Sequence, residues 1–418
     1  MKRKTSLIML CITLLIINPF LPFASVEAKG KSSCCIIQTK DNITDYIWSS
    51  DGTMIAYITC PDEQPWNGEL WVAKKHPNQA RILNKHLIYT GVESNGLQDW
   101  EGKWILFMMR KEEGTPSEYY GKNELWKIRF NGENLTQITF TYTNGIRTEW
   151  WNDAYINRGT VATGKFIPGT DLVFFTAHDG NGWYKAYTCK DDGSDQWQLI
   201  SGSYYAFTSA ISPTGNKLVW GHATYWNNPT TLMASNVDGT DRVTIKAFTH
   251  RTFPLVLADG NTIIWSWNDG NIHAIDMDGS NNRVVIDDEY ENYWENYHPL
   301  YGYVFLMRSN RAEDGNQHIF SITTDGIEKN QLTDGEYNDE GAMYSPNGRY
   351  LMYRRLPVDF DKNSNIQPYP YELVIKLLEP RHWHWWYHWH WQNSCNNYIP
   401  NHWHWHNSHN NHNPHPWH

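Results

Sequence analysis

The sequence predicts an all-β fold: a seven-bladed β-propeller of four-stranded blades, closed by an N-terminal strand and followed by a low-complexity C-terminal tail. The first observation is a row of seven glycine turns, each followed by an apolar, strand-like run, at Gly52, Gly102, Gly169, Gly215, Gly260, Gly302 and Gly348. Their spacings along the chain are 50, 67, 46, 45, 42 and 46 residues. Repeats of about this length are typical of propeller blades, and the 3.6-residue periodicity of helical repeats is absent.

A second glycine turn lies inside most repeats and sets the number of strands in each. It reads Asn-Gly or Asp-Gly at 131–132, 192–193, 238–239, 278–279 and 325–326. Apolar runs lie on both sides, as at 272–275 and 283–286 around the fourth of these turns. Tight hairpin turns favour glycine because they need a positive φ angle. Each repeat is therefore predicted to consist of two hairpins.

The turn motifs resemble those of the TolB-type (PD40, WD40-like) propeller family. Ser-Pro-x-Gly precedes a strand at 212–215 and at 345–348, and Asp-Gly precedes the last strand of a repeat at 238–239. The segment 319–333 ends in Asn-Gln-Leu-Thr, which is similar to the family's repeat ending. The resemblance covers residues 34–380. It implies that both kinds of glycine turn share one face, and that the remaining loops form the opposite face.

The last repeat lacks a fourth strand, because its apolar pattern stops after residues 371–377. A strand-like run at 35–39 precedes the first repeat, and Thr39 lies about as far before Gly52 as Thr333 lies before Gly348. We expect residues 34–39 to supply the missing strand. That pairing would close the ring and remove exposed sheet edges.

The two ends of the chain differ from the repeats. Residues 1–28 are typical of a signal peptide, with Lys2, Arg3 and Lys4 before an apolar run at 7–17 and small residues up to Ala28. We therefore expect a signal peptide at 1–28, a propeller at 29–380 and a His/Trp-rich tail at 381–418. The protein would then be secreted or otherwise extracytoplasmic, in the periplasm or at the cell surface.

Charge and cysteine content narrow the function classes. The chain has 45 acidic and 35 basic residues and no basic stripe, so nucleic acid is not expected as a partner. Five cysteines would remain after signal cleavage, at Cys34, Cys35, Cys60, Cys189 and Cys395. This odd number allows one or two disulfides with one thiol left over, and Cys395 could reach Cys34 or Cys35.

The loops of the face opposite the glycine turns are rich in aromatic and charged residues. Aromatic rings among Arg, Asp and Glu suit a sugar or a protein surface, because the rings stack and the polar groups pair. The alternative is that these rings pack the loops onto the propeller. The predicted ligand-binding residues are Arg147, Glu149, Trp150, Trp151, Asp153, Tyr225, Trp226, Tyr293, Trp294 and Arg308. The expected partner is a protein or a cell-surface glycan.

Most enzyme signatures are missing from the sequence. Neither Gly-x-Ser-x-Gly nor His-Glu-x-x-His occurs, no cofactor is required, and we expect a binding protein rather than an enzyme. The alternative is a polysaccharide lyase or glycosidase that works in the central channel. Oligogalacturonate lyases resemble this architecture and use a channel metal, but their ligands have no residue-by-residue match here. Histidines that could converge on such a channel are His178, His222, His250, His298 and His318.

The tail has a composition of its own. Residues 382–418 hold 11 of the 19 His and eight of the 23 Trp, with no Lys, Arg, Asp or Glu. His and Trp alternate, which would place them on opposite sides of an extended segment. Neutral imidazoles two residues apart can chelate Zn²⁺, Cu²⁺ or Ni²⁺. The candidate metal ligands are His382, His384, His388, His390, His402, His404 and His406. Alternatives are a tail with no specific ligand, self-association of a structural surface protein, or attachment to a membrane or wall.

The tail prediction is tested by metal analysis of the full-length protein and of a version ending at residue 380. After incubation with Zn²⁺, Cu²⁺ or Ni²⁺ and desalting, only the full-length protein should retain metal, because the seven candidate ligands lie beyond residue 380. Equal retention by the two proteins would place the metal elsewhere.

Overall fold

The computed structural model describes residues 34–37, 42–61, 67–110, 123–139, 161–178, 184–199, 205–223, 230–247, 253–266, 270–358 and 371–378. The chain divides into a unit of Met1–Ser33 and a unit of Cys34–His418, and all described residues belong to the second. The predicted signal peptide and the His/Trp-rich tail lie outside the described residues. No helix long and apolar enough to cross a membrane occurs within the described ranges.

Six antiparallel β-sheets make up the described part of the chain. The first sheet has seven strands: β2 (Asn42–Trp48), β3 (Met54–Cys60), β4 (Gly68–Lys75), β5 (Ile82–Glu101), β6 (Trp104–Arg110), β7 (Asn123–Arg129) and β8 (Thr136–Gln137). The second has β9 (Val161–Phe166), β10 (Leu172–His178), β11 (Tyr184–Lys190) and β12 (Trp197–Gln198). The third has β13 (Tyr205–Ile211), β14 (Lys217–Ala223), β15 (Thr230–Asn236) and β16 (Val243–Ala247).

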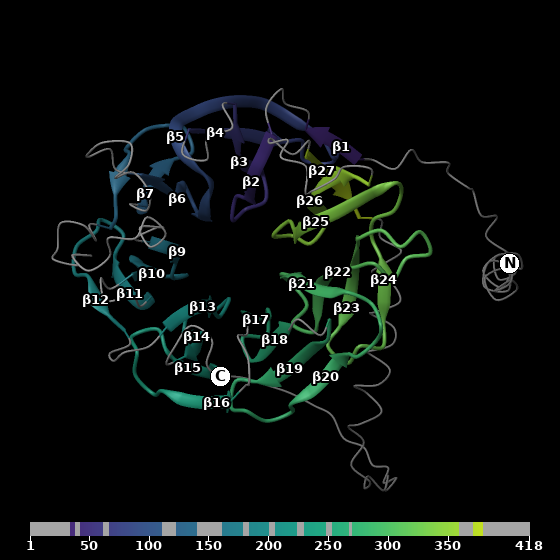
Figure 1. Ribbon diagram of the computed structural model, residues 1–418. Helices are drawn as coiled ribbons and strands as arrows, with labels where there is room; N and C mark the ends of the chain where they lie inside the picture. The colour runs from purple at the N-terminus through teal and green to yellow at the C-terminus, as the bar shows by residue number, and fades with distance from the viewer. Residues whose placement is uncertain are drawn as a thin grey trace, which may run out of the picture. The chain divides into compact units, whose positions relative to one another are not determined.

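The other three sheets also have four strands each. The fourth has β17 (Phe253–Val256), β18 (Thr262–Ser266), β19 (Ile272–Asp276) and β20 (Arg283–Ile286). The fifth has β21 (Asn292–Tyr297), β22 (Val304–Ser309), β23 (His318–Thr323) and β24 (Lys329–Gln331). The sixth has β25 (Tyr337–Tyr344), β26 (Tyr350–Pro357), β27 (Glu372–Leu377) and, from the start of the chain, β1 (Cys34–Ile37). Figure 1 shows these sheets following one another in chain order around a common centre, which is a propeller arrangement.

The prediction of seven four-stranded blades is corrected by the structure, which has five four-stranded sheets in the described ranges. The seven-stranded sheet holds the residues of the first two predicted repeats. The cause is β5, a continuous strand of 20 residues that pairs first with β4 and then with β6. Register shifts between Val92 and Leu97 accompany the change of partner, so the chain never leaves the sheet between the two repeats.

Closure by the N-terminal strand is confirmed. β1 pairs antiparallel with β27, with Cys34 opposite Lys376 and Ile37 opposite Leu373. A hydrophobic cluster then joins the first and last sheets, and it contains Ile37, Ile43, Tyr46, Trp48, Ile55, Tyr57, Tyr350, Met352, Leu373 and Ile375. The Tyr46 hydroxyl donates a 2.6 Å hydrogen bond to the Gly341 carbonyl across the same junction.

The two kinds of glycine turn lie at one end of the sheets, as the family resemblance implied. One backbone hydrogen bond recurs at this end, from the residue after a sheet's third strand to the residue after its first glycine turn: from Met277 N to Asn261 O, Thr324 N to Tyr303 O and Leu378 N to Arg349 O, each 2.9 Å long. It occurs twice in the seven-stranded sheet, from Lys75 N to Thr53 O and from Phe130 N to Lys103 O. We call this end the turn face and the opposite end, with the β22–β23 connection, the loop face.

The core lies between neighbouring sheets. One cluster joins Ile264 and Ile272 of the fourth sheet to Phe305 and Phe320 of the fifth. Burial of each such side chain contributes about 1.5–3 kcal/mol, so every sheet depends on its neighbours. Two cysteines, Cys60 and Cys189, are buried in these layers, and burial, aided by Asp192, raises the pKa of Cys189 to about 12.

Two carboxylates beside β-bulges connect strands that are not paired with each other. One connects β2 to β5 within the first sheet, and the other connects β5 of the first sheet to β9 of the second. Asp45 follows a bulge in β2 and accepts a 2.9 Å hydrogen bond from the Leu97 backbone N–H of β5. Asp99 follows a bulge in β5 and accepts a 3.0 Å bond from the Phe166 N–H of β9. A bulge turns the side chain out of the ordinary alternation, which lets it reach the next strand.

The closing contact predicts an unequal cost for two glycine substitutions. Gly341 and Gly315 both have positive φ, at 66° and 70°, but only at Gly341 would an added Cβ meet the Tyr46 hydroxyl, at 2.5 Å. Gly341→Ala should lower the free energy of unfolding by about 3 kcal/mol, and Gly315→Ala by about 1 kcal/mol. Urea denaturation measures both, and equal losses would show that the closing contact tolerates a side chain.

Asp45 predicts a loss of stability at high pH. Burial raises its pKa to about 7, and this effect outweighs the hydrogen bonds from the Tyr46 and Leu97 N–H groups, which lower the pKa. Because this is above the ordinary value of 3.8, the native state holds the proton more tightly. The contribution is present at low pH and is lost as pH rises through 7. The urea midpoint of the wild type should therefore fall more between pH 5.5 and 8 than that of Asp45→Asn. Parallel pH profiles would contradict this.

Candidate functional site

Two groups of charged side chains lie where the fifth and sixth sheets meet. We call Glu295, Arg308, Glu340 and Arg354 the inner cluster, and Asp314, His318, Asp339 and Arg355 the histidine network. Asp339 and Glu340 are consecutive in β25, and each lies opposite an arginine of β26: Asp339 opposite Arg355 and Glu340 opposite Arg354. Because side chains alternate along a strand, the two acid–arginine pairs lie on opposite faces of the sheet and enter different groups.

The inner cluster is a continuous chain of ion pairs. Glu295 occupies a bulge in β21, between Trp294 and Asn296. Arg308 Nε lies 3.1 Å from Glu295 Oε1, and Arg308 Nη1 lies 3.1 Å from Glu340 Oε2. The bulge therefore brings the Glu295 carboxylate to the same guanidinium that binds Glu340 of the next sheet.

The chain of ion pairs continues into the first sheet. Arg354 Nη2 lies 3.1 Å from Glu340 Oε1, and its Nη1 donates a 3.0 Å hydrogen bond to the Thr44 carbonyl of β2. Three sheets are thus connected through Glu340 and its two arginines. Paired charges of this kind avoid the cost of burying a lone ion.

The inner cluster holds one acid that can gain or lose a proton near neutrality. Burial raises the pKa of Glu295 to about 7; the positive charge of Arg308 opposes this rise and the negative charge of Glu340 adds to it. Burial would lower the pKa of Arg354, but Tyr46 and Glu340 outweigh it and raise that pKa, so the guanidinium stays charged. A carboxyl of raised pKa beside a second carboxylate can serve as a general acid.

An exposed aromatic surface borders the inner cluster. Tyr293 lies opposite Arg308 in the sheet and is 39% exposed, with the Arg308 guanidinium carbon 4.8 Å from its ring centre. Tyr290 is 38% exposed and has Arg311 at 5.5 Å from its ring centre. Each tyrosine therefore presents a ring to solvent next to a fixed guanidinium.

Arg311 is itself held in place. Its Nη2 lies 3.0 Å from Asp288 Oδ2 and donates a 2.7 Å hydrogen bond to Asn292 Oδ1. The Asn292 carboxamide oxygen also accepts a bond from the buried Ser309 hydroxyl. We call Tyr290 and Tyr293 the tyrosine surface. A hydrogen-bonded frame of Arg311, Asp288, Asn292 and Ser309 lies beneath it.

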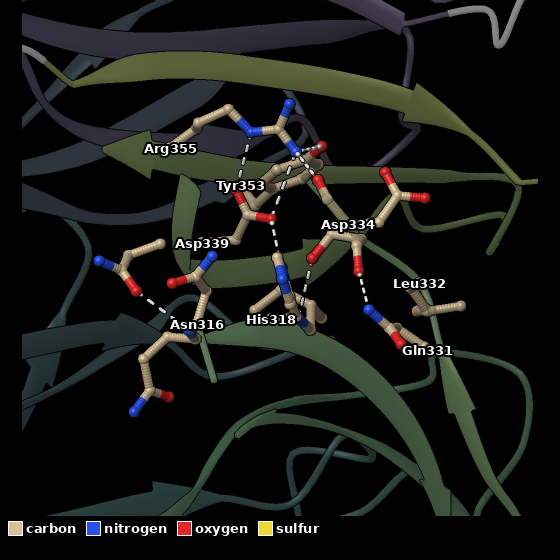
Figure 2. A network of polar contacts seen from close by, with 12 residues as sticks. Asn316, His318, Gln331, Leu332, Asp334, Asp339, Tyr353 and Arg355 are labelled. Carbon is tan, nitrogen blue, oxygen red and sulfur yellow. Dashed lines mark hydrogen bonds and ion pairs between the residues drawn. The ribbon is translucent and has the colours of Figure 1, made fainter. Parts of the chain in front are cut away.

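The histidine network is centred on His318, and Figure 2 shows this side chain beside Asp339, Tyr353 and Arg355. The His318 side chain is fully buried, with Nε2 2.9 Å from Asp314 Oδ2 and Nδ1 3.5 Å from Asp339 Oδ2. Arg355 Nε donates a 2.8 Å hydrogen bond to Asp339 Oδ1, and Arg355 Nη2 one of 3.2 Å to the Tyr353 hydroxyl. Burial lowers the pKa of His318, but Asp339 and Asp314 outweigh it and raise that pKa overall. This network ties β23 to β25 and β26.

Of the five histidines predicted to converge on the channel, His298 and His318 have described side chains, and these two do not share a site. His298 lies on the turn face, where its ring is 4.5 Å from both Tyr301 and Tyr344, and burial lowers its pKa to about 4. His318 pairs with Ser309 at the loop-face end of the same sheet. Within the residues that the structure describes, no group of three or more His, Cys, Asp or Glu could hold a metal ion.

Three of the predicted ligand-binding residues fall within the described ranges. Tyr293 and Arg308 lie together at the tyrosine surface. Trp294 is partly buried and packs against the core between the fourth and fifth sheets. Outside the described residues lie Arg147, Glu149, Trp150, Trp151, Asp153, Tyr225 and Trp226, and the tail histidines His382, His384, His388, His390, His402, His404 and His406.

Sequence reasoning did not identify Glu295, Glu340 or Arg354 as site residues. Glu295 lies in an aromatic-rich loop segment of the sequence, but its role depends on a bulge that the strand pattern does not reveal. Glu340 and Arg354 are charged residues in strands, and only their pairing across β25 and β26 brings them together. Charged residues inside strand-like segments were the available signal.

Comparison with known proteins bears on the fold. No protein-family model and no curated protein matches the chain. It is similar to the structure of a Mycobacterium tuberculosis puromycin-hydrolyzing peptidase (TM-score 0.52, 12% identity), over 79% of this chain and 54% of that one. It is also similar to an oligogalacturonate lyase in complex with manganese (TM-score 0.44, 13% identity, 67% and 87% covered) and to TolB from Acinetobacter baumannii (0.43, 11%, 77% and 78%). At these identities the similarity concerns the propeller fold alone.

Proposed function

We propose that this protein is a propeller-type interaction module that binds a protein or a glycan at the tyrosine surface. The observation that carries the proposal is the Tyr293 ring, half exposed and placed beside an arginine that is fixed by two carboxylates. A pre-positioned aromatic ring loses little conformational entropy on binding, which is why such rings dominate recognition surfaces. Arg308 and Arg311 next to the rings add donors for hydroxyl or carboxylate groups.

The pairing of the charged groups favours binding over catalysis. Both carboxylates of the inner cluster are bound to guanidinium groups, and Arg354 also holds the first sheet through Thr44. These contacts suit a rigid frame under a binding surface. Removing one partner would leave a buried charge, so the cluster is expected to resist rearrangement around a substrate.

A second candidate is a glycosidase or polysaccharide lyase. It is favoured by the placement of Glu295 and Glu340 on one guanidinium, together with the pKa of about 7 that burial gives Glu295. A carboxyl group of raised pKa beside a second carboxylate is typical of sites that break glycosidic bonds. In that reading Glu295 is the acid and Tyr293 a stacking platform for the sugar.

Several further properties belong to the same proposal. We infer that the repeats are of the TolB type, on the strength of the Ser-Pro-x-Gly turns and the recurring turn-to-turn hydrogen bond. We also propose an extracytoplasmic location, from the signal-like residues 1–28, and Zn²⁺, Cu²⁺ or Ni²⁺ binding by the tail histidines. Self-association through the tail is the remaining alternative.

The tyrosine surface is tested with Tyr293→Ala, assayed against a panel of soluble oligosaccharides and a panel of peptides. Loss of the ring should weaken binding of the best ligand about tenfold, since a stacked ring contributes about 1–2 kcal/mol. Tyr293→Phe keeps the ring and should bind within about twofold of the wild type. Isothermal titration calorimetry gives the affinities.

Val243→Ala is the matched control, because Val243 is an exposed residue of β16 in a different sheet. Its affinity should equal that of the wild type. Unchanged affinity in Tyr293→Ala would remove the tyrosine surface from the binding site. Release of reducing or unsaturated ends from an oligosaccharide, lost in Glu295→Gln, would replace the binding proposal by the enzymatic one.

A further inference from the structure

An apolar patch lies on the turn face of the fifth sheet, away from the tyrosine surface. Leu300 is 61% exposed in the β21–β22 turn, and Ile327 is 73% exposed in the β23–β24 turn. The two turns are joined by the hydrogen bond from Thr324 N to Tyr303 O. Tyr301 and Tyr303 belong to the first of these turns, and their ring centres are 5.9 Å from each other. We call Leu300, Tyr301, Tyr303 and Ile327 the turn-face patch.

Ile327 departs from the pattern of the chain's own repeats. The residue after the second glycine turn is exposed in each repeat, and elsewhere it is polar: Glu133, Ser194, Thr240 and Ser280. An apolar side chain at this position loses contact with water only if something covers it. A large exposed apolar group where the repeats place polar ones is typical of a contact surface.

The chain leaves the sixth sheet beside this patch. β27 ends on the turn face, where Leu378 N donates a 2.9 Å hydrogen bond to the Arg349 carbonyl. The neighbouring turn of the fifth sheet is in contact, because the His298 ring lies 4.5 Å from both Tyr301 and Tyr344. Lys376 also reaches the fifth sheet and donates a 2.7 Å bond to the Leu332 carbonyl.

On the other side of the exit point lies the first sheet, and its described turn-face residues differ from the patch. There the turns of the first sheet expose Asp51, Asn78 and Gln79. Residues 382–418 carry eight tryptophans and no Lys, Arg, Asp or Glu, so their composition suits the apolar turn-face patch rather than the polar turns of the first sheet. Four residues of extended chain span about 14 Å, which is enough to bring His382 from Leu378 to the adjacent sheet.

We propose that the segment 382–418 docks on the turn-face patch of its own chain through its tryptophan side chains. Indole rings would cover Leu300 and Ile327, and the alternating histidines would point away from the patch. The site goes beyond the proposed ligand-binding function, because it lies on the opposite face from Tyr293. The loop face would remain open to a partner.

The test is chymotryptic cleavage of the tail in full-length protein. Chymotrypsin cuts after Trp and Tyr, and a docked segment is cleaved only when it opens. The double substitution Leu300→Ser with Ile327→Ser should raise the initial rate of cleavage within 382–418 about fivefold or more, by mass spectrometry. Both side chains are exposed, so the thermal midpoint should not change.

Val243→Ser with Val284→Ser is the matched control, since both valines are exposed on the edge strands β16 and β20. Its tail should be cleaved at the wild-type rate. Equal cleavage of the wild type and the Leu300/Ile327 variant would overturn the proposal. A wild-type rate that falls as protein concentration rises would also overturn it, in favour of a second copy as the occupant.

Discussion

The packing of each sheet against two neighbours is the constraint on which the rest of this structure depends. A four-stranded sheet with apolar side chains on both faces cannot bury them alone, and the clusters between sheets show where they go. The arrangement works only if the first sheet meets the last. β1 makes that junction by pairing with β27, and Ile37, Tyr46 and Leu373 fill the space behind it.

The closed arrangement also explains how so many charges are held near its centre. Innermost strands carry bulges, and the residues at or beside them reach other strands. Asp99 reaches Phe166 of the second sheet, whereas Asp45 reaches Leu97 and Glu295 reaches Arg308 within their own sheets. Each of these acids has a pKa raised by burial. For Asp45 and Glu295 the raised pKa is about 7, so the charge of these two groups changes near neutral pH.

The tyrosine surface rests on this charged frame. Arg308 cannot leave Tyr293 without breaking its ion pairs to Glu295 and Glu340, which link two sheets. The histidine network fixes β23 to β25 on the other side of the sheet. Rigidity at the loop face thus comes from the junctions between sheets. The turn face of the fifth sheet instead carries the turn-face patch, for which we propose a different occupant, the segment 382–418.

Much of the fold followed from local signals in the sequence. Glycine turns with Asn-Gly, Asp-Gly and Ser-Pro-x-Gly patterns located the hairpins, because positive φ is a property of the turn itself. The missing fourth strand and the run at 35–39 located the closure that β1 and β27 make. Tyr293 and Arg308 were predicted to bind a ligand because aromatic and arginine residues are enriched at recognition surfaces; they lie in β21 and β22, and their binding role stays a prediction.

What only the tertiary structure decided depends on partners distant in sequence. The merging of two predicted repeats through β5 rests on register shifts that leave no periodic signature. Glu295, Glu340 and Arg354 become one cluster only when three sheets meet, and Leu300 and Ile327 become one patch only when two turns are hydrogen-bonded. The sequence by itself determined the repeats, the turns and the composition of the ends. The folded chain determined which charges neutralise each other, since ion pairs follow distance in space rather than along the chain.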